Sequence, residues 1–383
     1  MKYIPLVQVC DFQGGSQPPK DQWIDHEKEG YIRMLQIRDF TQPDKENVEF
    51  VRISKTIKTC NEDDILIGRY GASVGKILTG LAGAYNVAII KTIPDTSKLS
   101  KRFLYHYLNS PYFQNFILSV GSRAAQAGFN KDDLSDAQIP DLSLEEQSNV
   151  VSQLDKVTEL IVLRKEQLAK LDQLVKSRFI ELFGTPLLNE KGWVVKSTGD
   201  VCSVTDGSHF SPVGKEDGYP MLSVRNMRND GFHYDDCKLV SQEDYDILVK
   251  QGCKPLKNDV LIAKDGSYFY YGFVVKEEIE QAVLSSIAIL RPNLEQVNPE
   301  YLCRYMLSSE IVDLVGKNYV TGAAIKRVIL KGIKQISVML PPIELQNQFA
   351  AFVEQTDKSK LAIQQSLDKL ETLKKSLMQE YFG

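Results

Sequence analysis

The chain has 383 residues, of which 43% are hydrophobic and 25% are charged. This composition is typical of a folded protein and excludes wholesale disorder, and the length favours two or three domains over a single core. The formal net charge of -4 gives no global attraction to nucleic acid, although phosphates respond to a local basic surface and not to the sum. Because we find neither a long apolar run nor a signal-peptide layout, we expect a cytoplasmic protein with no membrane partner.

Cysteine and histidine residues predict no metal or disulfide site. The six cysteines are scattered without a C-x-x-C pair, and the four histidines are equally dispersed. Neither a zinc site nor a disulfide framework is therefore expected. Cys10 and Cys202 lie in apolar runs, so we interpret both as small core residues.

The first predicted domain covers residues 1–142. Short apolar, β-branched runs such as 65–67 and 87–90 are separated by Gly, Pro, Asn and Asp, which is typical of strands joined by turns. Residues 101–119 carry apolar side chains at three-and-four spacing, which predicts helix. This domain is thus expected to be mostly β.

A long helix is predicted over residues 143–184. No proline or glycine occurs between Ser143 and Phe183. The apolar residues of this segment follow a heptad pattern that only Arg164 and Arg178 break. Ser143 and Glu146 form a capping box at the start, and Gly184 ends the segment. We therefore expect a helix of about 40 residues.

The second half of the chain repeats this order, with a domain at 185–341 and a helix at 342–383. The heptad pattern of this second helix is weakened by Thr356 and Lys360. The repeat is visible in detail, since Asp64-Ile-Leu-Ile recurs as Asp259-Val-Leu-Ile, 195 positions later (259 − 64). A period this long indicates a duplicated domain and not a solenoid.

The order of elements predicts an α+β fold with pseudo-two-fold symmetry. A 40-residue helix is roughly 60 Å long, so the first helix should separate the two mostly-β domains. The second helix can bury its apolar stripe by running back along the first, which makes an antiparallel coiled coil. The two domains would then be held at a fixed distance in opposite orientations.

Such an arrangement fits a ligand that presents two separated, symmetry-related sites. Double-stranded DNA is the commonest ligand of this kind. The alternative is a pseudo-symmetric coiled-coil scaffold that joins two protein partners without reading DNA. A continuous positive stripe along both domains would favour DNA over the scaffold.

Several motifs occur twice and carry a family resemblance. They are E-L-F-G-T-P and E-Y-F-G at the helix ends, D-D-I-L-I-G-R-Y-G and N-D-V-L-I-A-K-D-G in the domains, and I-P-x-L-S-L-E-E-Q and L-P-P-I-E-L-Q at the helix entries. With G-Y-x-R-M-L-Q-I-R-D-F and G-Y-P-M-L-S-V-R-N, this order resembles the specificity subunit of type I restriction-modification systems over the whole chain.

The resemblance implies a function and a set of partners. Each domain would be a target recognition domain that reads one half of a split DNA sequence, and the helices would set the spacing and dock two methyltransferase subunits. Restriction subunits would join through the assembled complex. S-adenosylmethionine, ATP and magnesium would belong to those partners, with no cofactor on this chain.

The sequence also predicts that the chain is not an enzyme. Neither Pro-Pro pair lies in the [DNS]-P-P-[YF] turn that an adenine methyltransferase needs. The string Gly71-Ala-Ser-Val-Gly75-Lys76 resembles a P-loop, but Tyr70 replaces its first glycine and Ile77 its magnesium-binding hydroxyl residue.

Candidate DNA contacts in the first domain are polar or aromatic residues on loops and strand ends. A glycine-rich loop, two strand ends and a Gly-Ala segment supply Gln13, Ser16, Gln17, Lys20, Arg38, Arg69, Tyr70 and Arg123. A plain turn, a solvated strand end or a brace within the fold is the alternative for each.

The second domain offers candidate DNA contacts of the same kinds. They are Ser208, His209, Arg225, Lys264, Tyr268, Tyr270, Lys326 and Arg327. The aromatic run at 268–271 would stack on bases or lie partly in the core. Because the flanks match while the loop contents differ, we expect the two domains to read different sequences.

Overall fold

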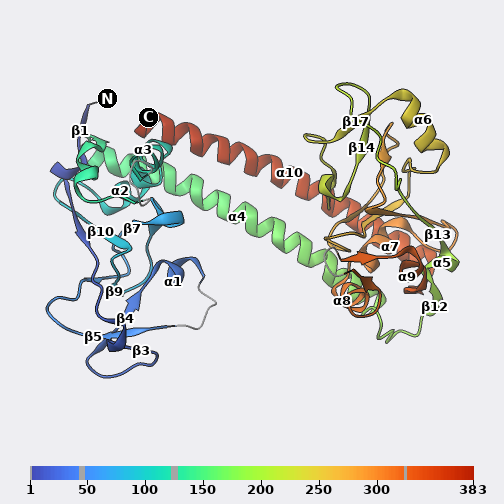
Figure 1. Ribbon diagram of the computed structural model, residues 1–383, viewed down its shortest axis with the longest axis horizontal. Coiled ribbons are helices and arrows are strands. Elements are labelled where there is room, and N and C mark those ends of the chain that lie inside the picture. The colour runs from blue at the N-terminus through green and yellow to red at the C-terminus, as the bar shows by residue number, and fades with distance from the viewer. Residues whose placement is uncertain (1, 43–47, 122–127, 323–325) are drawn as a thin grey trace. The chain divides into compact units, whose positions relative to one another are not determined.

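The computed structural model describes residues 2–42, 48–121, 128–322 and 326–383. The chain divides into two compact units (Figure 1). Unit 1 contains Met1–Glu166 and Gln364–Gly383, and unit 2 contains Gln167–Ile363. Each unit therefore consists of one globular part together with one end of each long helix.

Unit 1 is built on two small sheets. The first is antiparallel, and its strand order is β2 (Cys10–Gly14), β10 (Ile89–Pro94), β7 (Leu66–Gly68) and β8 (Ile77–Leu78). The second has the order β3 (Trp23–Ile24), β5 (Phe50–Arg52), β4 (Tyr31–Leu35), β9 (Gly83–Tyr85) and β6 (Thr59–Cys60), with β4 and β9 parallel. Ile67 and Leu35 are buried completely, which explains the apolar runs that predicted these strands.

Short elements complete unit 1. Strand β1 pairs with β11 near the entry to the long helix, and the side chain of Ser100 caps α2 by accepting the Phe103 N–H. The remaining bounds are β1 (Tyr3–Pro5), β11 (Gln138–Pro140), α1 (Ile37–Thr41), α2 (Lys101–Leu108), α3 (Pro111–Gly121), and 3-10 turns at Leu6–Gln8, Lys20–Gln22, Gly71–Ser73 and Asp132–Asp136.

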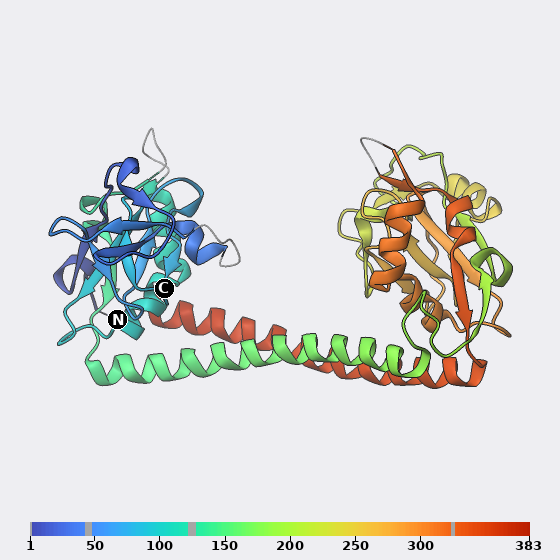
Figure 2. The same ribbon diagram turned by 90° about the horizontal axis from the view of Figure 1, so that it is seen from below.

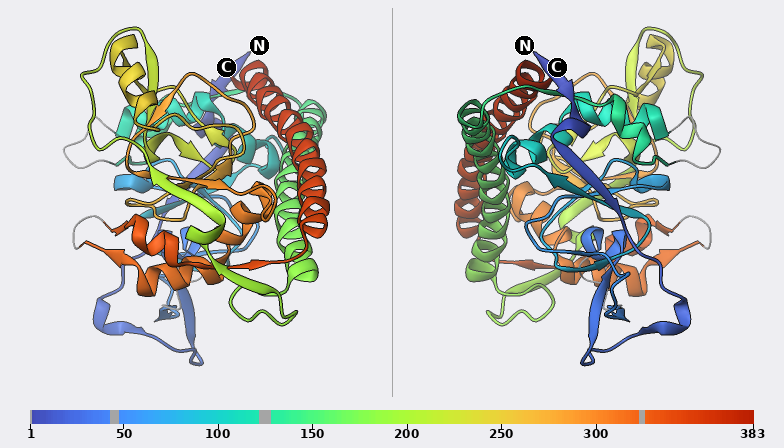
Figure 3. Two further views of the ribbon diagram at one scale, coloured as in Figure 1. Left: turned by 90° about the vertical axis from the view of Figure 1, so that its right-hand side faces the viewer. Right: turned by 90° about the vertical axis from the view of Figure 1, so that its left-hand side faces the viewer.

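Unit 2 repeats this topology. Its four-stranded antiparallel sheet has the order β13 (Cys202–Asp206), β21 (Ile287–Pro292), β18 (Val260–Ala263) and β19 (Gly272–Val274). The second sheet has the order β17 (Lys238–Val240), β14 (Tyr219–Leu222) and β20 (Ala282–Val283), and β14 and β20 are parallel, like β4 and β9. Figure 3 shows the ribbon in two further views, in which the strands of unit 2 and of unit 1 can be followed by colour.

Helices cover the main sheet of unit 2 as they do in unit 1. The other elements are β12 (Val194–Ser197) paired with β24 (Ser337–Leu340), hairpins β15 (Met227–Arg228)/β16 (Gly231–Phe232) and β22 (Val320–Thr321)/β23 (Arg327–Val328), helices α5 (Thr198–Val201), α6 (Gln242–Lys250), α7 (Pro299–Met306), α8 (Ser309–Asn318) and α9 (Leu330–Gln335), and a 3-10 turn at Val224–Asn226. The predicted internal repeat and α+β class are confirmed.

The two long helices are α4 (Leu144–Phe183) and α10 (Ile343–Phe382), each of 40 residues. Both start and end within one residue of the predicted helix segments. The Ser143 hydroxyl and backbone N–H contact the Glu146 carboxylate at 2.8 Å, so the predicted capping box is present. The four-segment domain division stays a prediction, because the two units share both helices.

Within each unit the helices run antiparallel, as predicted (Figure 2). In unit 1, Tyr381 donates a hydrogen bond to Gln153, and Lys165 lies 2.9 Å from Glu371. In unit 2, Lys360 pairs with Asp172 at 2.5 Å. Residue numbers thus rise on one helix as they fall on the other.

The last phenylalanine of each long helix closes one globular core. Phe382 of α10 is fully buried in unit 1, with its ring 5.3 Å from Phe103 and 5.9 Å from Tyr107. Phe183 of α4 is fully buried in unit 2, 4.7 Å from Tyr301 and 5.4 Å from Phe349. This burial is the physical reason for the repeated phenylalanine at the helix ends.

Candidate nucleic-acid interface

Many of the candidate residues lie where strands of the main sheet of each unit end. In unit 1 these are the end of β2 and the segment after β7, and in unit 2 the end of β13 and the segment after β18. Three candidates lie elsewhere, Lys20 and Arg225 in 3-10 turns and Arg38 on α1. A bridge joins Tyr70 to Gly128, and the equivalent bridge joins Asp265 to Arg327. The fold therefore brings together, in each unit, three segments that are distant in the sequence.

Glycines in the two equivalent loops permit close approach of the backbone. A Cβ atom on Gly15 would lie 2.0 Å from Asn86 O, and one on Gly207 would lie 2.0 Å from Val283 O. No side chain other than hydrogen fits at such distances. The repeated Gly-Ser pair thus anchors each loop to the neighbouring strand.

Two of the loop candidates in unit 1 are engaged within the fold. Ser16 Oγ donates to Thr56 O and accepts the Lys58 N–H, and the half-buried Gln13 accepts a hydrogen bond from Tyr85. The hydroxyl of the buried Ser208 likewise donates to Phe210 O. These contacts favour the plain-turn interpretation for Ser16 and Ser208 and a bracing role within the fold for Gln13, which lies in β2. Gln17 is exposed.

Glu49 neutralises two candidate cations of unit 1. Lys20 Nζ lies 2.6 Å from this carboxylate and 3.8 Å from the Trp23 ring centroid, and Arg38 Nη2 lies 2.5 Å from Glu49. Burial by itself would raise the pKa of Glu49, but hydrogen bonds from Lys20 and Gln36 outweigh it and lower that pKa. Arg225, at the repeat position of Arg38, is exposed.

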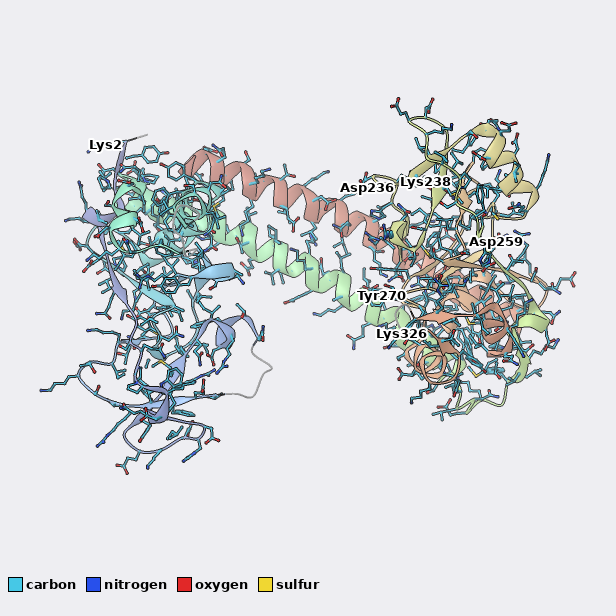
Figure 4. All side chains as sticks on the ribbon, in the orientation of Figure 1. Lys2, Asp236, Lys238, Asp259, Tyr270 and Lys326 are labelled. Carbon is cyan, nitrogen blue, oxygen red and sulfur yellow. The ribbon has the colours of Figure 1, made fainter. Side chains whose placement is uncertain are left out.

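The aromatic run of unit 2 divides into packed and exposed members. Phe269 is 2% exposed and adopts φ +54°, while Tyr268 packs against the same core. Tyr270 is 67% exposed, and Figure 4 marks its position together with that of Lys326. Because a left-handed Phe costs about 1–3 kcal/mol, the fold holds Tyr270 outward against local strain. Tyr70 of unit 1 is also exposed, at 42%.

Lys264, His209 and Arg327 of unit 2 form one cluster with two carboxylates. Lys264 Nζ lies 3.3 Å from Asp206 Oδ2 and 3.5 Å from Asp265 Oδ1. His209 lies 3.3 Å from Asp206, and Arg327 lies 3.8 Å from Asp265. Lys326 is exposed, and its carbonyl accepts the Gly266 N–H. Arg123 lies outside the described residues.

Asp206 and Asp265 are the members of this cluster that the sequence prediction missed. The signal was present, since Asp206 stands where the first copy has Gly14, and Asp265 where it has Tyr70. Position-by-position comparison of the two copies could have found them.

Buried groups elsewhere act as structural anchors. Burial raises the pKa of the Cys10 and Cys202 thiols to about 12, so both remain protonated core residues, as predicted. Among the described residues, no group of three or more His, Cys, Asp or Glu side chains could hold a metal ion. No helix in the described part of the chain is long and apolar enough to cross a membrane.

Two copies of one α+β domain, each with cations and aromatic side chains at the edge of its main sheet, define the class of protein. The model of the type I restriction modification DNA specificity domain matches residues 1–173 and again residues 190–374. The chain belongs to this family and contains two copies of its domain.

Individual relatives agree with this assignment. The chain is 22% identical over 351 residues to the type I restriction enzyme EcoBI specificity subunit of Escherichia coli, which covers 84% of this chain and 73% of that protein. It is 23% identical over 377 residues to the MjaVIII specificity subunit of Methanocaldococcus jannaschii, covering 93% and 86%.

Solved structures share the fold. A chain of a type I R-M system has a TM-score of 0.59 at 17% identity, with 100% of this chain and 97% of that chain covered. The type I restriction-modification S subunit from M. genitalium has a TM-score of 0.58 at 15% identity, with coverages of 100% and 96%.

Proposed function

We propose that this chain is the DNA-specificity subunit of a type I restriction-modification complex. In this role each unit reads one half of a bipartite target in double-stranded DNA. The long helices set the distance between the half-sites and dock two methyltransferase subunits, through which restriction subunits join. The complex would act in the cytoplasm.

The observation that carries this proposal is the contrast between matched scaffolds and unmatched sheet edges. The main sheets of both units have the same strand order, and the same helix anchors support them, yet the residues at the sheet edges differ in charge and in aromatic content. A split, asymmetric DNA sequence requires two recognition surfaces that differ from each other on a common scaffold. This is because contacts to the bases determine which sequence is bound, whereas contacts to the DNA backbone position the protein.

The proposal assigns no chemistry to this chain. Residues 71–76, which resemble a P-loop, lead into strand β8, whereas a P-loop opens a helix. In this proposal, S-adenosylmethionine, ATP and magnesium are bound by the partner subunits, as in the family that the chain resembles. The chain itself would supply binding and orientation.

Mapping of methylated adenines tests the proposal. Cells that carry this chain with its methyltransferase partners should methylate one bipartite motif, and exchange of residues 1–140 for those of another family member should change only one half of that motif. The absence of any motif, or a change in both halves, contradicts the proposal.

The isolated chain should bind DNA weakly, and strongly only with the methyltransferase partners, because a net-acidic chain has few phosphate contacts of its own. Fluorescence anisotropy with a labelled duplex at several salt concentrations measures this. Tight, salt-insensitive binding by the chain alone would be incompatible with the proposal.

A further inference from the structure

Arg69 of unit 1 and Lys264 of unit 2 occupy the same position in the repeated fold. The Arg69 N–H donates to Ala88 O and the Lys264 N–H donates to Ser286 O, both at 2.9 Å. On the other side, Arg69 O accepts from Phe129 and Lys264 O accepts from Val328. The two cations therefore leave the sheet at the same point.

In unit 2 this cation is neutralised within the protein. Lys264 is only 7% exposed, and its ammonium group lies between the carboxylates of Asp206 and Asp265. A buried lysine with two carboxylates beside it has no charge left for a DNA phosphate. Arg327, whose side chain is 59% exposed, is the outer cation of this cluster.

In unit 1 the same position has no carboxylate. Gly14 stands where unit 2 has Asp206, and Tyr70 stands where it has Asp265. Arg69 forms no ion pair within the described part of unit 1. Its Nε donates to Phe129 O at 2.8 Å, and its guanidinium carbon lies 5.0 Å from the centroid of the Tyr70 ring.

These contacts fix the guanidinium without neutralising its charge. The hydrogen bond to Phe129 occupies Nε, and the ring of Tyr70 supports the planar group. The donors on Nη1 and Nη2 stay available as a rigid fork, which matches the acceptor pairs of phosphate and of a guanine edge.

We propose that Arg69 contacts a DNA acceptor group in the half-site read by unit 1, whereas Lys264 is a structural cation and the equivalent contact in unit 2 passes to Arg327. The proposal rests on the proposed function and adds to it a residue-level asymmetry. The cation that contacts DNA is Arg69, directly after β7, in unit 1 and Arg327, on β23, in unit 2.

Gly14 offers a direct test that leaves Arg69 in place. A Cβ atom at Gly14 would meet only Arg69 Nη1, at 3.8 Å, which is an ordinary contact. The Gly14→Asp variant should therefore place a carboxylate beside the guanidinium and reproduce the neutralised state of unit 2. Gly14→Asn is the matched control, since it has the same shape without the charge.

Two probes are used with the full chain assembled with its methyltransferase partners. The first is a labelled random-sequence duplex at low salt, and the second is a duplex that carries the mapped motif. We expect Gly14→Asp to bind the motif duplex about 10- to 100-fold more weakly than Gly14→Asn, the range of one good arginine contact. Urea midpoints of the two variants verify that both remain folded.

Further variants separate the two acceptors and the two units. Loss of a phosphate contact reduces the salt dependence with the motif unchanged, while loss of a guanine contact relaxes one base position. The Arg69→Lys variant should retain part of the affinity for the motif duplex. Arg327→Ala should weaken binding to the other half-site, and the double variant Lys264→Met/Asp206→Asn should change binding less than twofold.

The outcomes are distinct. Equal binding by Gly14→Asp and Gly14→Asn, or a larger loss from Lys264→Met/Asp206→Asn than from Gly14→Asp, overturns this inference and leaves the proposed function intact. If the unaltered assembly binds neither duplex and methylates no motif, both the inference and the proposed function are wrong.

Discussion

The two units are alike where they pack and unlike where they face solvent. Gln147 of unit 1 accepts the Ser100 N–H and donates to two backbone carbonyls, and Gln346 of unit 2 makes the same three contacts around Asn298. At the sheet edge, by contrast, the repeat position that is Gly14 in unit 1 is Asp206 in unit 2. Burial thus holds the repeat constant, because a buried anchor has few acceptable substitutes.

The largest expected effect comes from the phenylalanines that end the long helices. Phe382→Ala should destabilise unit 1 and Phe183→Ala unit 2, each by about 3–5 kcal/mol, because a fully buried ring is removed. Hydrogen exchange read by mass spectrometry reports on each unit separately. Phe210→Ala is the control, since Phe210 is 67% exposed. Equal loosening of both units by either variant would refute this assignment of cores.

The buried glutamines should give the next largest effect. Gln147→Ala and Gln346→Ala each leave one N–H and two carbonyls without a partner, at a cost of about 2–4 kcal/mol. Hydrogen exchange should show that the first turns of α4 or α10 detach from their globular part. Gln364→Ala, on an exposed face, serves as the control; a similar loss there would contradict the anchor role.

A third difference between the units should appear in mildly acid solution. His106 is 2% exposed and lies 2.7 Å from Asp155, with Arg102, Tyr105 and Lys374 nearby. Burial lowers the pKa of His106, and this outweighs the opposing effect of Asp155. The folded state therefore binds a proton less readily than the unfolded state.

The sign of the pH effect follows from that lowered pKa. The stability contributed by neutral His106 is present above the ordinary histidine pKa, near 6.5, and is lost as the pH falls below it. Unit 1 should therefore be less stable at pH 5.5 than at pH 7.5. Unit 2 has Arg304 at this position, paired with Glu300, and should not respond.

Hydrogen-exchange rates at the two pH values, corrected for the intrinsic pH dependence of exchange, measure this difference between the units. The His106→Gln variant should remove the pH response of unit 1 while unit 2 stays unchanged. A response in unit 2, or one in unit 1 that survives His106→Gln, would assign the effect to other groups.

The smallest effect is expected where the second helix departs from the heptad pattern. Lys360 of unit 2 corresponds to the buried Ile161 of unit 1, and it pairs with Asp172 across the helices. Lys360→Ala should cost at most about 1 kcal/mol, whereas Lys360→Ile should be neutral or stabilising. Urea midpoints measure both, with the exposed Lys358→Ala as control. A large loss in Lys360→Ile would show that this ion pair is essential.

The weakened heptad also shows what the pattern alone could not resolve. Thr356 and Lys360 weaken the heptad pattern at this end of the second helix. In the structure Thr356 is 6% exposed and its hydroxyl donates to Phe352 O, while Lys360 reaches a carboxylate of the partner helix. A heptad pattern scores hydrophobicity only, so it misses polar residues that are satisfied locally.

The amino-acid sequence by itself determined the duplication, both long helices and the segments from which candidate DNA contacts come. These features depend on periodicity, on glycine and proline, and on similarity between the two copies, all of which are local or directly readable. The predicted distance between the two domains stays a prediction.

Which candidate charges are neutralised by ion pairs within the fold could be learned only from the three-dimensional structure. Lys264 and Arg69 look equivalent in the sequence, but the strand order β13, β21, β18 brings Asp206 to Lys264, while Gly14 leaves Arg69 without a carboxylate. In the same way, burial of Phe183 and Phe382 depends on which core each helix end reaches. Electrostatic and packing energies depend on distance in space, and sheet pairing sets that distance between residues far apart in the chain.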